Sequence, residues 1–517
     1  MRSDIPAPDI LIIGSGIGGA TMAAALAPTG ASILILEAGK QIIDSPHNSD
    51  QVSIFQHNYF KPDEEWFDQN MKPFRPGNYY NIGGNSKFYG AVLARYRKED
   101  FEEMQHLDGV SPAWPFAYNV LEPWYSKAEQ LYQVRGNFAE DPSEPHHSLA
   151  YPYPPIPDEP CIRSVRDKLI ALGLKPYSLP LGVDIDQWRK TRNTPWDAHP
   201  HFFEGKMDAE TAALSQALKY GNVQIQTESK VVRLNACQTT GKITDVEFIC
   251  QGVHQKIKSP LVILSAGAIH SAVLLLRSSS DHYPAGLANS SDMVGRNFMN
   301  HNASALIAFS PTFNNDSFYQ KTFGLNDFYL SDPELSCPLG NIQLLGRVSE
   351  NILKSSLQRV PKCALRYLSK HSIDFYAMSE DLPERDNRVM IEGDKIILKW
   401  KRNNWRSHML LVKRMKKALK SCGFPLVFSK PFDKRTPSHQ CGTVRMGVDP
   451  KLSPLDPFCR AWNHDNLFVV DASFMPTSAA VNPSLTIAAQ ALRVADEIIR
   501  SERLASVTSM ENSVGTG

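Results

Sequence analysis

Short apolar runs separated by small residues dominate the amino-terminal pattern. Residues 10–13 and 33–36 are apolar throughout, which is typical of strands buried on both faces of a parallel sheet. The segment between them is rich in alanine and glycine and has the length of a short helix. The pattern therefore predicts a strand, a helix and a second parallel strand, the unit from which α/β domains are built.

Two later segments repeat this pattern. Residues 261–264 form an apolar run that leads through small residues into a helical segment at 269–277. Residues 467–471 form another apolar run, which ends in an acid and is followed by a predicted helix at 485–500. Further strands are predicted at 223–226, 230–234 and 244–250. We expect these segments to return the chain to a core sheet.

Residues 301–436 have a different pattern, with strand-like runs and one basic helix at 405–422. The runs are 303–309, 341–345, 388–392 and 395–400. They favour an antiparallel sheet with helices. Residues 43–80 have neither the helical nor the strand period of apolar residues and are expected to be a long loop. The proline-rich segment 138–160 is expected to connect two lobes. The predicted fold class is α/β, or α+β overall: a Rossmann-like domain with a second domain built on an antiparallel sheet with helices.

The balance of charge argues against a polyanionic partner. The 517 residues include 55 basic and 54 acidic side chains, so we expect a small-molecule partner and neither nucleic acid nor an anionic membrane surface. The sequence has no apolar stretch of about 18 residues, so we expect no membrane span. The predicted strand at residue 10 follows a short polar segment, 1–8, so we also expect no signal peptide. The eight cysteines lack any C-x-x-C pair, which favours buried free thiols, a cytoplasmic location and no metal site.

Gly14, Gly16 and Gly19 form the spacing G-x-G-x-x-G where the first strand meets the helix. The first glycine permits a tight turn, the second lets backbone approach a pyrophosphate, and the third lets the helix pack closely on the sheet. Glu37, 23 residues after Gly14, is placed to accept from both hydroxyls of an adenosine ribose. A glycine cluster alone is more often an ordinary turn, but the strands, the helix and the acid together predict a dinucleotide site.

Two further groups of small residues are candidates for cofactor contacts. The glycines of 83–90, with the hydroxyl of Ser86, would let backbone lie against a flat or charged ligand, although an ordinary loop explains them equally well. The small residues at 265–268 would let a cofactor sit across the strand ends, and close packing is the alternative. Asp471, at the end of its predicted strand, can accept a hydrogen bond from a ribityl or phosphate-side hydroxyl.

In their order along the chain, these motifs resemble those of the glucose-methanol-choline (GMC) flavin oxidoreductases. The motifs are the opening fingerprint, Gly83-Gly-Asn-Ser with Gly90-Ala, Ser265-Ala-Gly-Ala, Val294-Gly-Arg-Asn-Phe-Met-Asn-His, His439-Gln-Cys-Gly-Thr, and Val470-Asp-Ala-Ser with Asn482-Pro. The resemblance implies FAD, two lobes and oxidation of a primary or secondary alcohol. By motif position, His439 is the catalytic histidine. Asn482, 43 residues later, takes the partner position, as in cholesterol- and pyranose-oxidase-like and bacterial choline-dehydrogenase-like members.

The resemblance also implies which residues contact FAD. The expected contacts are Gly14, Gly16, Ile17, Gly18, Gly19, Glu37, Ala38, Gly83, Gly84, Asn85, Ser86, Gly90, Ala91, Val232, Ala266, Gly267, Asp471, Ala472, Pro483 and Thr486. Members with covalently attached FAD carry a histidine after the Gly-Gly pair. This chain has Lys87-Phe88-Tyr89 there, so we expect FAD to be held non-covalently.

The same resemblance divides the chain into domains. The expected FAD-binding domain is discontinuous and comprises 1–45, 78–105, 208–300 and 437–504. The expected substrate-binding domain and cap comprise 106–207 and 301–436, and residues 505–517 are expected to be a disordered tail.

Oxidation of an alcohol by a flavin needs a hydride acceptor and a group that takes the hydroxyl proton. A neutral imidazole at His439 can take this proton, while the amide of Asn482 can hydrogen-bond the same hydroxyl. We expect the helix at 485–500 to place its positive end by the isoalloxazine ring. The other histidines singled out by the sequence are expected to be packing or surface residues: His270, His301 and His408.

Two other functions stay open on the sequence. Hydroxynitrile lyases, one branch that resembles this family, use FAD structurally while a histidine performs acid–base cleavage. An FAD-binding protein without turnover would carry similar cofactor motifs. The asparagine partner and the polar second lobe favour a sugar, glycoside or cyclic polyol as the alcohol, ahead of choline-like and aliphatic alcohols. The sequence does not distinguish oxygen, a quinone or a carrier protein as the electron acceptor.

Overall fold

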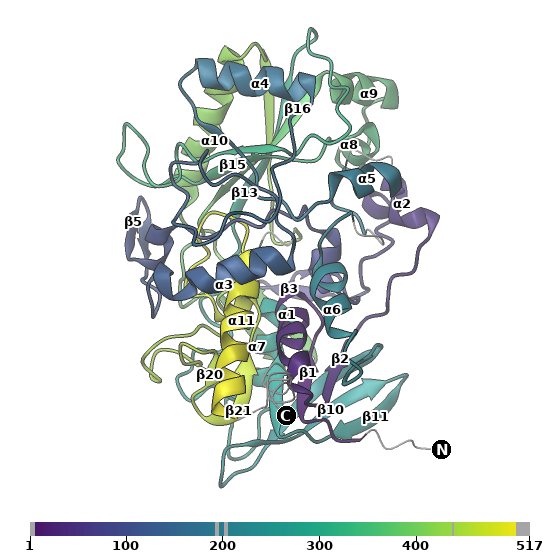
Figure 1. Cartoon of the computed structure of the whole chain (residues 1–517), viewed down its shortest axis with the longest axis vertical. Helices are drawn as coiled ribbons and strands as arrows, with labels where there is room; N and C mark the ends of the chain where they lie inside the picture. Colours follow the sequence, from purple (N-terminus) through teal and green to yellow (C-terminus); the bar gives the residue numbers. More distant parts are fainter. Residues whose placement is uncertain (1–5, 192–195, 201–204, 437–438, 503–517) are drawn as a thin grey trace, which may run out of the picture.

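The structure is a computed structural model that describes residues 6–191, 196–200, 205–436 and 439–502. It has two lobes stacked along its long axis: a lobe that contains β1, β2 and β21 in the lower half of Figure 1, and a lobe that contains β13, β15 and β16 in the upper half. The predicted disordered tail, 505–517, lies outside the described residues.

The lower lobe is built on a six-stranded sheet in which five neighbouring strands run parallel. Its order is β20 (Arg460–Ala461), β21 (His464–Val469), β12 (Leu261–Leu264), β1 (Ile10–Ile13), β2 (Ile33–Leu36) and β8 (Val223–Gln226). The three central strands are wholly apolar and buried, as expected of a parallel sheet covered on both faces. The predicted Rossmann-like architecture is confirmed.

Helices cover this sheet. The small residues of α1 (Ile17–Leu26) let it pack against α11 (Ser484–Ser501), which in turn packs against α3 (Tyr118–Leu131). The helix α7 (Gly267–Arg277) follows β12 and packs against β9 (Ser229–Ala236). That strand forms an antiparallel sheet with β10 (Ile243–Cys250) and β11 (Val253–Ile257). The strands predicted at 223–226, 230–234 and 244–250 are thereby confirmed, but only the first joins the core sheet, so the expectation that all three return the chain to that sheet is wrong for the other two.

The upper lobe is built on a six-stranded antiparallel sheet, as the pattern of 301–436 predicts. Its order is β19 (Leu426–Pro431), β13 (Asn302–Phe309), β16 (Ser372–Ser379), β15 (Asn341–Leu344), β14 (Phe323–Leu325) and β7 (Pro176–Ser178). The basic helix α10 (Trp405–Ser421) packs across β13, β16 and β19. Further helices are α4 (Pro160–Ala171), α8 (Glu350–Ser356) and α9 (Lys362–Lys370).

Two sequence predictions about the lobes are wrong. Residues 43–80 are not simply a loop, because they contain α2 (Gln51–Phe55) and two short strands, β3 (Trp66–Asp68) and β4 (Pro73–Phe74). These strands join β18 (Lys395–Lys399), which pairs with β17 (Arg388–Glu392). The 388–400 hairpin therefore lies outside the upper sheet, and β17 packs against α7 of the lower lobe. The other boundaries given for the domains stay predictions.

The remaining described elements are short. They are α5 (Ile185–Thr191), α6 (Ser215–Ala217), a π-helix (Ala209–Leu214), the strand pair β5 (Met104–His106) and β6 (Gly109–Ser111), and 3-10 turns at Ala27–Thr29, Pro46–Asn48, Gly84–Phe88, Lys98–Phe101 and Ala472–Phe474. No helix in the described ranges is long and apolar enough to cross a membrane. All eight cysteines are free, but only Cys337, Cys422, Cys441 and Cys459 are buried, so the expectation of buried thiols holds for half of them.

Close backbone contact holds α1 against the sheet. A Cβ atom added at Gly18 would lie closer than 3.0 Å to the carbonyl oxygen of Val470, just beyond the end of β21. A Cβ atom added at Gly14, whose φ is +97°, would also lie closer than 3.0 Å to a carbonyl oxygen, that of Ser265 beyond β12. The first turn of α1 can therefore approach these two strand ends only because glycines stand there.

Gly18→Ala is expected to lower the free energy of unfolding by about 1–3 kcal/mol, because the added methyl must push α1 away from Val470. Gly221→Ala is the matched control, since Gly221 has no atom within 4 Å of an added Cβ. The control should change stability by less than about 0.5 kcal/mol. Urea unfolding followed by circular dichroism measures both. Equal losses in the two variants would contradict the close contact.

Candidate active site

Glycines from three segments face open space at the carboxyl ends of the parallel strands. Gly16 in the turn between β1 and α1 and Gly267 at the start of α7 have no atom within 4 Å of an added Cβ. Gly84, at a φ of +54°, has Gly16 Cα as the nearest atom to such a Cβ, at 3.6 Å. Exposed backbone at the N-terminus of a helix suits a pyrophosphate, so this cradle fits a dinucleotide.

Glu37 joins two of these segments, those of Gly16 and Gly84, to the end of β2. Its Oε2 accepts hydrogen bonds from the backbone N (3.0 Å) and Oγ (2.6 Å) of Ser15, and its Oε1 accepts from Gly39 N (2.9 Å). Ser15 Oγ accepts in turn from Gly83 N at 3.1 Å. Burial raises the pKa of the Glu37 carboxyl. Oε2 already accepts two hydrogen bonds, so the lone pair that remains for a ribose hydroxyl is on Oε1, and this contact stays a prediction.

Asp471 holds the start of α7. Its Oδ2 accepts from Gly267 N (3.0 Å) and Ser271 Oγ (2.5 Å), and its Oδ1 accepts from Ser473 N (2.8 Å). Burial raises the pKa of this carboxyl. Asp471 thus ties the end of β21 to the helix after β12, which places it beside the glycine cradle with its oxygens already engaged by protein donors.

The other predicted cofactor residues lie in the same group of segments. In 83–91, Asn85 Oδ1 accepts from Tyr79 N at 2.9 Å, and Ser86 Oγ donates to Gly83 O at 2.6 Å. Ala91 is buried and has a φ of +50°. The others have these places: Ile17 and Gly19 in the first turn of α1, Ala38 after β2, Val232 in β9, Ala266 before α7, Ala472 after β21, and Pro483 and Thr486 at the start of α11.

The structure brings His439 and Asn482 together and adds a third side chain. Asn482 Nδ2 lies 3.3 Å from His439 Nε2, and His301 Nδ1 lies 2.9 Å from His439 Nδ1. His439 and Asn482 are half-buried, whereas His301 is 1% exposed. His301, which was expected to be a packing or surface residue, is buried and in addition contacts the predicted catalytic histidine. Its place at the end of the 294–301 motif was the available signal.

The carbonyl group of Ser478 determines which nitrogen atoms of His301 and His439 donate hydrogen bonds and which accept them. His301 Nε2 lies 2.8 Å from Ser478 O, which can only accept, so this nitrogen carries the proton. Burial lowers the pKa of His301 to about 4, so the ring is neutral and its Nδ1 is an acceptor. His439 Nδ1 must then donate to it. The lone pair of His439 is thereby placed on Nε2, the atom that faces Asn482.

The surroundings keep the ring of His439 neutral. Burial lowers its pKa well below the usual value, and His301 and the ammonium group of Lys321 lower it further. Two imidazoles in contact cannot easily both be protonated. The arrangement therefore offers a neutral nitrogen base beside an amide donor.

Backbone contacts hold His439 in an unusual conformation. Its φ is +64°, in the left-handed region. Cys441 pairs with Met299 through two backbone hydrogen bonds of 3.0 Å, and Gly442 N donates to Ala472 O at 3.1 Å. The strained residue is thus fixed between the 294–301 motif and the segment after β21. Strain of this kind, when surrounding contacts maintain it, is typical of functional sites.

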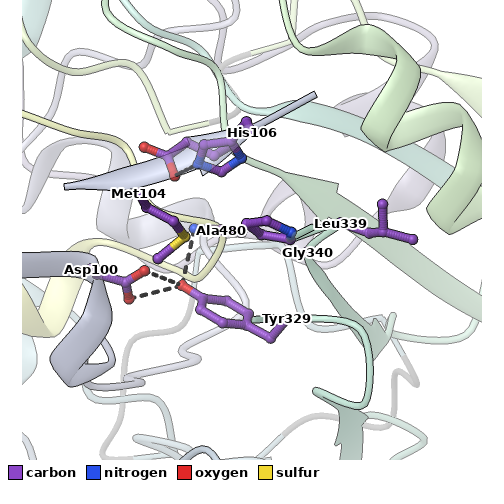
Figure 2. A pocket seen from close by; sticks show the side chains of 9 residues that line it. Asp100, Met104, His106, Tyr329, Leu339, Gly340 and Ala480 are labelled. Atoms are coloured by element: carbon purple, nitrogen blue, oxygen red, sulfur yellow. Dashed lines mark hydrogen bonds and ion pairs between the residues drawn. The ribbon is translucent and has the colours of Figure 1, made fainter. Parts of the chain in front are cut away.

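A small polar cavity supports the segment before Asn482. Figure 2 shows the Tyr329 hydroxyl between the Asp100 carboxylate and the backbone N of Ala480. Burial, and then the Glu380 carboxylate, raise the pKa of Asp100 to about 7. The cavity measures about 10 Å³, room for about one water molecule, so it is too small for a substrate. The hydroxyl of Tyr329 in its wall holds the backbone N of Ala480, two residues before Asn482. In the described ranges, no group of three or more His, Cys, Asp or Glu side chains could hold a metal ion.

Fold and site define an oxidoreductase of the dinucleotide-binding type. The family GMC oxidoreductase matches residues 195–303 with its N-terminal part and 386–491 with its C-terminal part, and an NAD(P)-binding Rossmann-like domain matches 12–61. The chain belongs to the GMC oxidoreductases, an enzyme family, and its cofactor is FAD. The glycine cradle and Glu37 fit the pyrophosphate and adenosine ribose of this cofactor.

Known proteins share this organisation over nearly their whole length. The chain is 27% identical to the 6'''-hydroxyparomomycin C oxidase of Streptomyces lividus, over 95% of this chain and 91% of that protein. It is 26% identical to the fructose dehydrogenase large subunit of Gluconobacter japonicus, over 96% and 99%. The fold resembles pyridoxine 4-oxidase from Mesorbium loti, with a TM-score of 0.67, 19% identity and coverage of 95% and 99%.

Glu37→Ala is expected to weaken FAD binding about 10- to 100-fold, the usual worth of a hydrogen bond to a charged group, without changing substrate preference. The control is Glu228→Ala, because Glu228 is an exposed carboxylate near the same strand ends. The measurement is a fluorescence titration of FAD into apoprotein prepared by acid precipitation. Unchanged affinity in Glu37→Ala would show that Glu37 holds only protein backbone.

Proposed function

We propose that this protein oxidises an alcohol to the carbonyl compound at His439 and Asn482. The observation that carries the proposal is the orientation of His439, whose unprotonated Nε2 faces the Asn482 amide at 3.3 Å beside the FAD-binding segments. When bound, FAD supplies the acceptor for the hydride. The protein residues then have to hold the hydroxyl group and take its proton.

His439 and Asn482 divide this work. His439 Nε2 accepts the hydroxyl proton, since its neutral state is favoured by burial and by its neighbours. Asn482 Nδ2 donates to the same oxygen, which fixes the hydroxyl and stabilises the negative charge that grows as the proton leaves. The helix α11 begins two residues after Asn482, and its N-terminus adds positive potential at this end of the site.

FAD is held without a covalent bond in this proposal. The side chains after the Gly-Gly pair are engaged elsewhere: Lys87 forms ion pairs with Asp208 and Glu210, and Phe88 stacks on Tyr79 with ring centroids 3.8 Å apart. The Tyr89 hydroxyl donates to Met207 O. None of these is the histidine that covalent members use.

The proposed substrate is a sugar, glycoside or cyclic polyol. Support comes from relatives that are named for fructose and for a hydroxylated paromomycin and that align over nearly the full chain. The electron acceptor stays open among oxygen, a quinone and a carrier protein. A cytoplasmic location also stays a proposal, supported by eight cysteines that are all free.

His439→Ala is expected to slow anaerobic flavin reduction about 10²- to 10⁴-fold, the usual worth of a positioned acid–base group, while FAD stays bound. Stopped-flow bleaching of the flavin by a saturating sugar or polyol measures this rate. His254→Ala is the control, because His254 is exposed in β11. Asn482→Asp should also be slow, since it replaces the amide donor with a negative charge.

A His439→Ala variant that is reduced as fast as the parent would place the base elsewhere. Flavin of the parent that no alcohol bleaches, in a protein that cleaves a hydroxynitrile, would indicate a lyase instead.

His301→Ala is expected to slow flavin reduction about 3- to 10-fold, the worth of one neutral hydrogen bond, because His439 Nδ1–H loses its acceptor. It should also raise the pKa of His439, since His301 lowers it. The base must be neutral, so the rising limb of the pH–rate profile should move to higher pH. His301→Gln should restore much of the rate, because its amide can donate to Ser478 O and accept from His439. A profile unchanged in His301→Ala would refute the orienting role.

A further inference from the structure

A buried ion pair lies beside the candidate active site. Lys321 Nζ and Asp197 Oδ2 are 3.0 Å apart, and their side chains are 7% and 4% exposed. Lys321 comes shortly before β14 in the upper lobe, and Asp197 lies in the described segment 196–200. The pair thus joins two segments of the lobe that the sequence assigns to the substrate.

Glycines make room for this pair next to the cofactor segment. A Cβ atom added at Gly90 would lie closer than 3.0 Å to both Lys321 Nζ and Asp197 Oδ2. A Cβ atom added at Gly346 would lie at 2.5 Å from Asp197 Oδ1. Gly90 is a predicted cofactor contact, and Lys321 is near enough to His439 to lower its pKa. The pair is therefore close to both the cofactor segment and the proposed base.

Two polar groups at the ion pair have hydrogen-bonding capacity that the described residues do not use. Among the described residues, Asp197 Oδ2 accepts no hydrogen bond beyond its ion pair with Lys321. The hydroxyl of Tyr319, which is 2% exposed, has no hydrogen-bond partner in the same ranges. Asp197 raises the pKa of this hydroxyl after burial does, so the two groups are close. The acceptor Asp197 Oδ2 and two donors, the ammonium group of Lys321 and the hydroxyl of Tyr319, thus lie together near the proposed base.

Stability alone does not account for the pair. Removing two charges from water costs several kcal/mol, about as much as their attraction returns, and well-packed apolar residues often replace such pairs without loss. A buried acceptor and hydroxyl without partners cost more still. Groups of this kind are satisfied by a ligand whose own hydroxyl groups supply the missing partners.

We propose that Asp197, Lys321 and Tyr319 form a subsite for a second hydroxyl group of the substrate, next to the carbon that is oxidised. This inference rests on the proposed alcohol oxidation at His439. Asp197 accepts from the second hydroxyl, while the Lys321 ammonium group and the Tyr319 hydroxyl donate to its oxygen. The subsite selects vicinal diols and polyols over alcohols with a single hydroxyl group.

The test compares two alcohols that differ by one hydroxyl group, propane-1,2-diol and propan-1-ol. Anaerobic reduction of the flavin in the full-length holoenzyme gives kcat/KM for each. The parent is expected to favour the diol about 10- to 100-fold, the worth of a hydrogen bond to a charged group. Lys321→Met with Asp197→Asn should reduce this preference to within about threefold, mostly through KM. The double variant leaves no buried unpaired charge, so it is expected to fold even where Lys321→Met alone does not.

Lys256→Met is the matched control, because Lys256 forms an exposed ion pair with Glu247 at 2.8 Å, far from the site in β11. It should keep the preference of the parent. A parent that is reduced by both alcohols equally well would overturn the subsite and leave the alcohol oxidation standing. A double variant that keeps the preference for the diol would also overturn it. Flavin that neither alcohol bleaches would overturn both proposals.

Discussion

Close backbone contact at the carboxyl ends of β1, β12 and β21 is the constraint on which the rest of the molecule depends. Gly14 lies against Ser265, and Gly18 lies against Val470, so side chains at these glycines would push α1 away from the sheet. From these strand ends the chain continues into the glycine turn after β1, the start of α7 after β12, and the Asp471 segment after β21. Three stretches that are distant in sequence therefore meet at one edge, where open α/β sheets bind their ligands.

Backbone contacts beyond β21 also hold the segment that carries the proposed base. Beyond β21, residues 472–474 accept backbone hydrogen bonds from the segment that follows His439, and Cys441 is paired with Met299. His439 is thus held by two neighbours at a φ of +64°, which an isolated chain would rarely adopt. The Ser478 carbonyl then orients His301, and His301 orients His439. A single carbonyl group decides which nitrogen of the proposed base carries the lone pair.

Local patterns account for what could be predicted from the sequence. The parallel strands were predictable because buried β1 and β2 are apolar throughout, and the cradle because glycine spacing reports close backbone approach. By contrast, β3 and β4 are two or three residues long, and β3, on which β4 pairs, depends on pairing with β18, more than 300 residues away. The contacts of His301 with His439 and of Lys321 with Asp197 also join distant segments. Spacing along the chain does not predict such contacts, although the place of His301 at the end of the 294–301 motif was a signal that it belongs to the site.

The electrostatics of the site explain how a weak base can serve. Burial, His301 and Lys321 all lower the pKa of His439, so its ring is neutral over a wide pH range but holds a proton weakly. A proton then moves to it only if the surroundings also favour the alkoxide that is left behind. Under the proposed assignment, the Asn482 amide, the N-terminus of α11 and the ammonium group of Lys321 all present positive potential to that oxygen. Lys321, which weakens the base, therefore also makes the substrate hydroxyl more acidic, and its two effects act on the proton transfer in opposite directions.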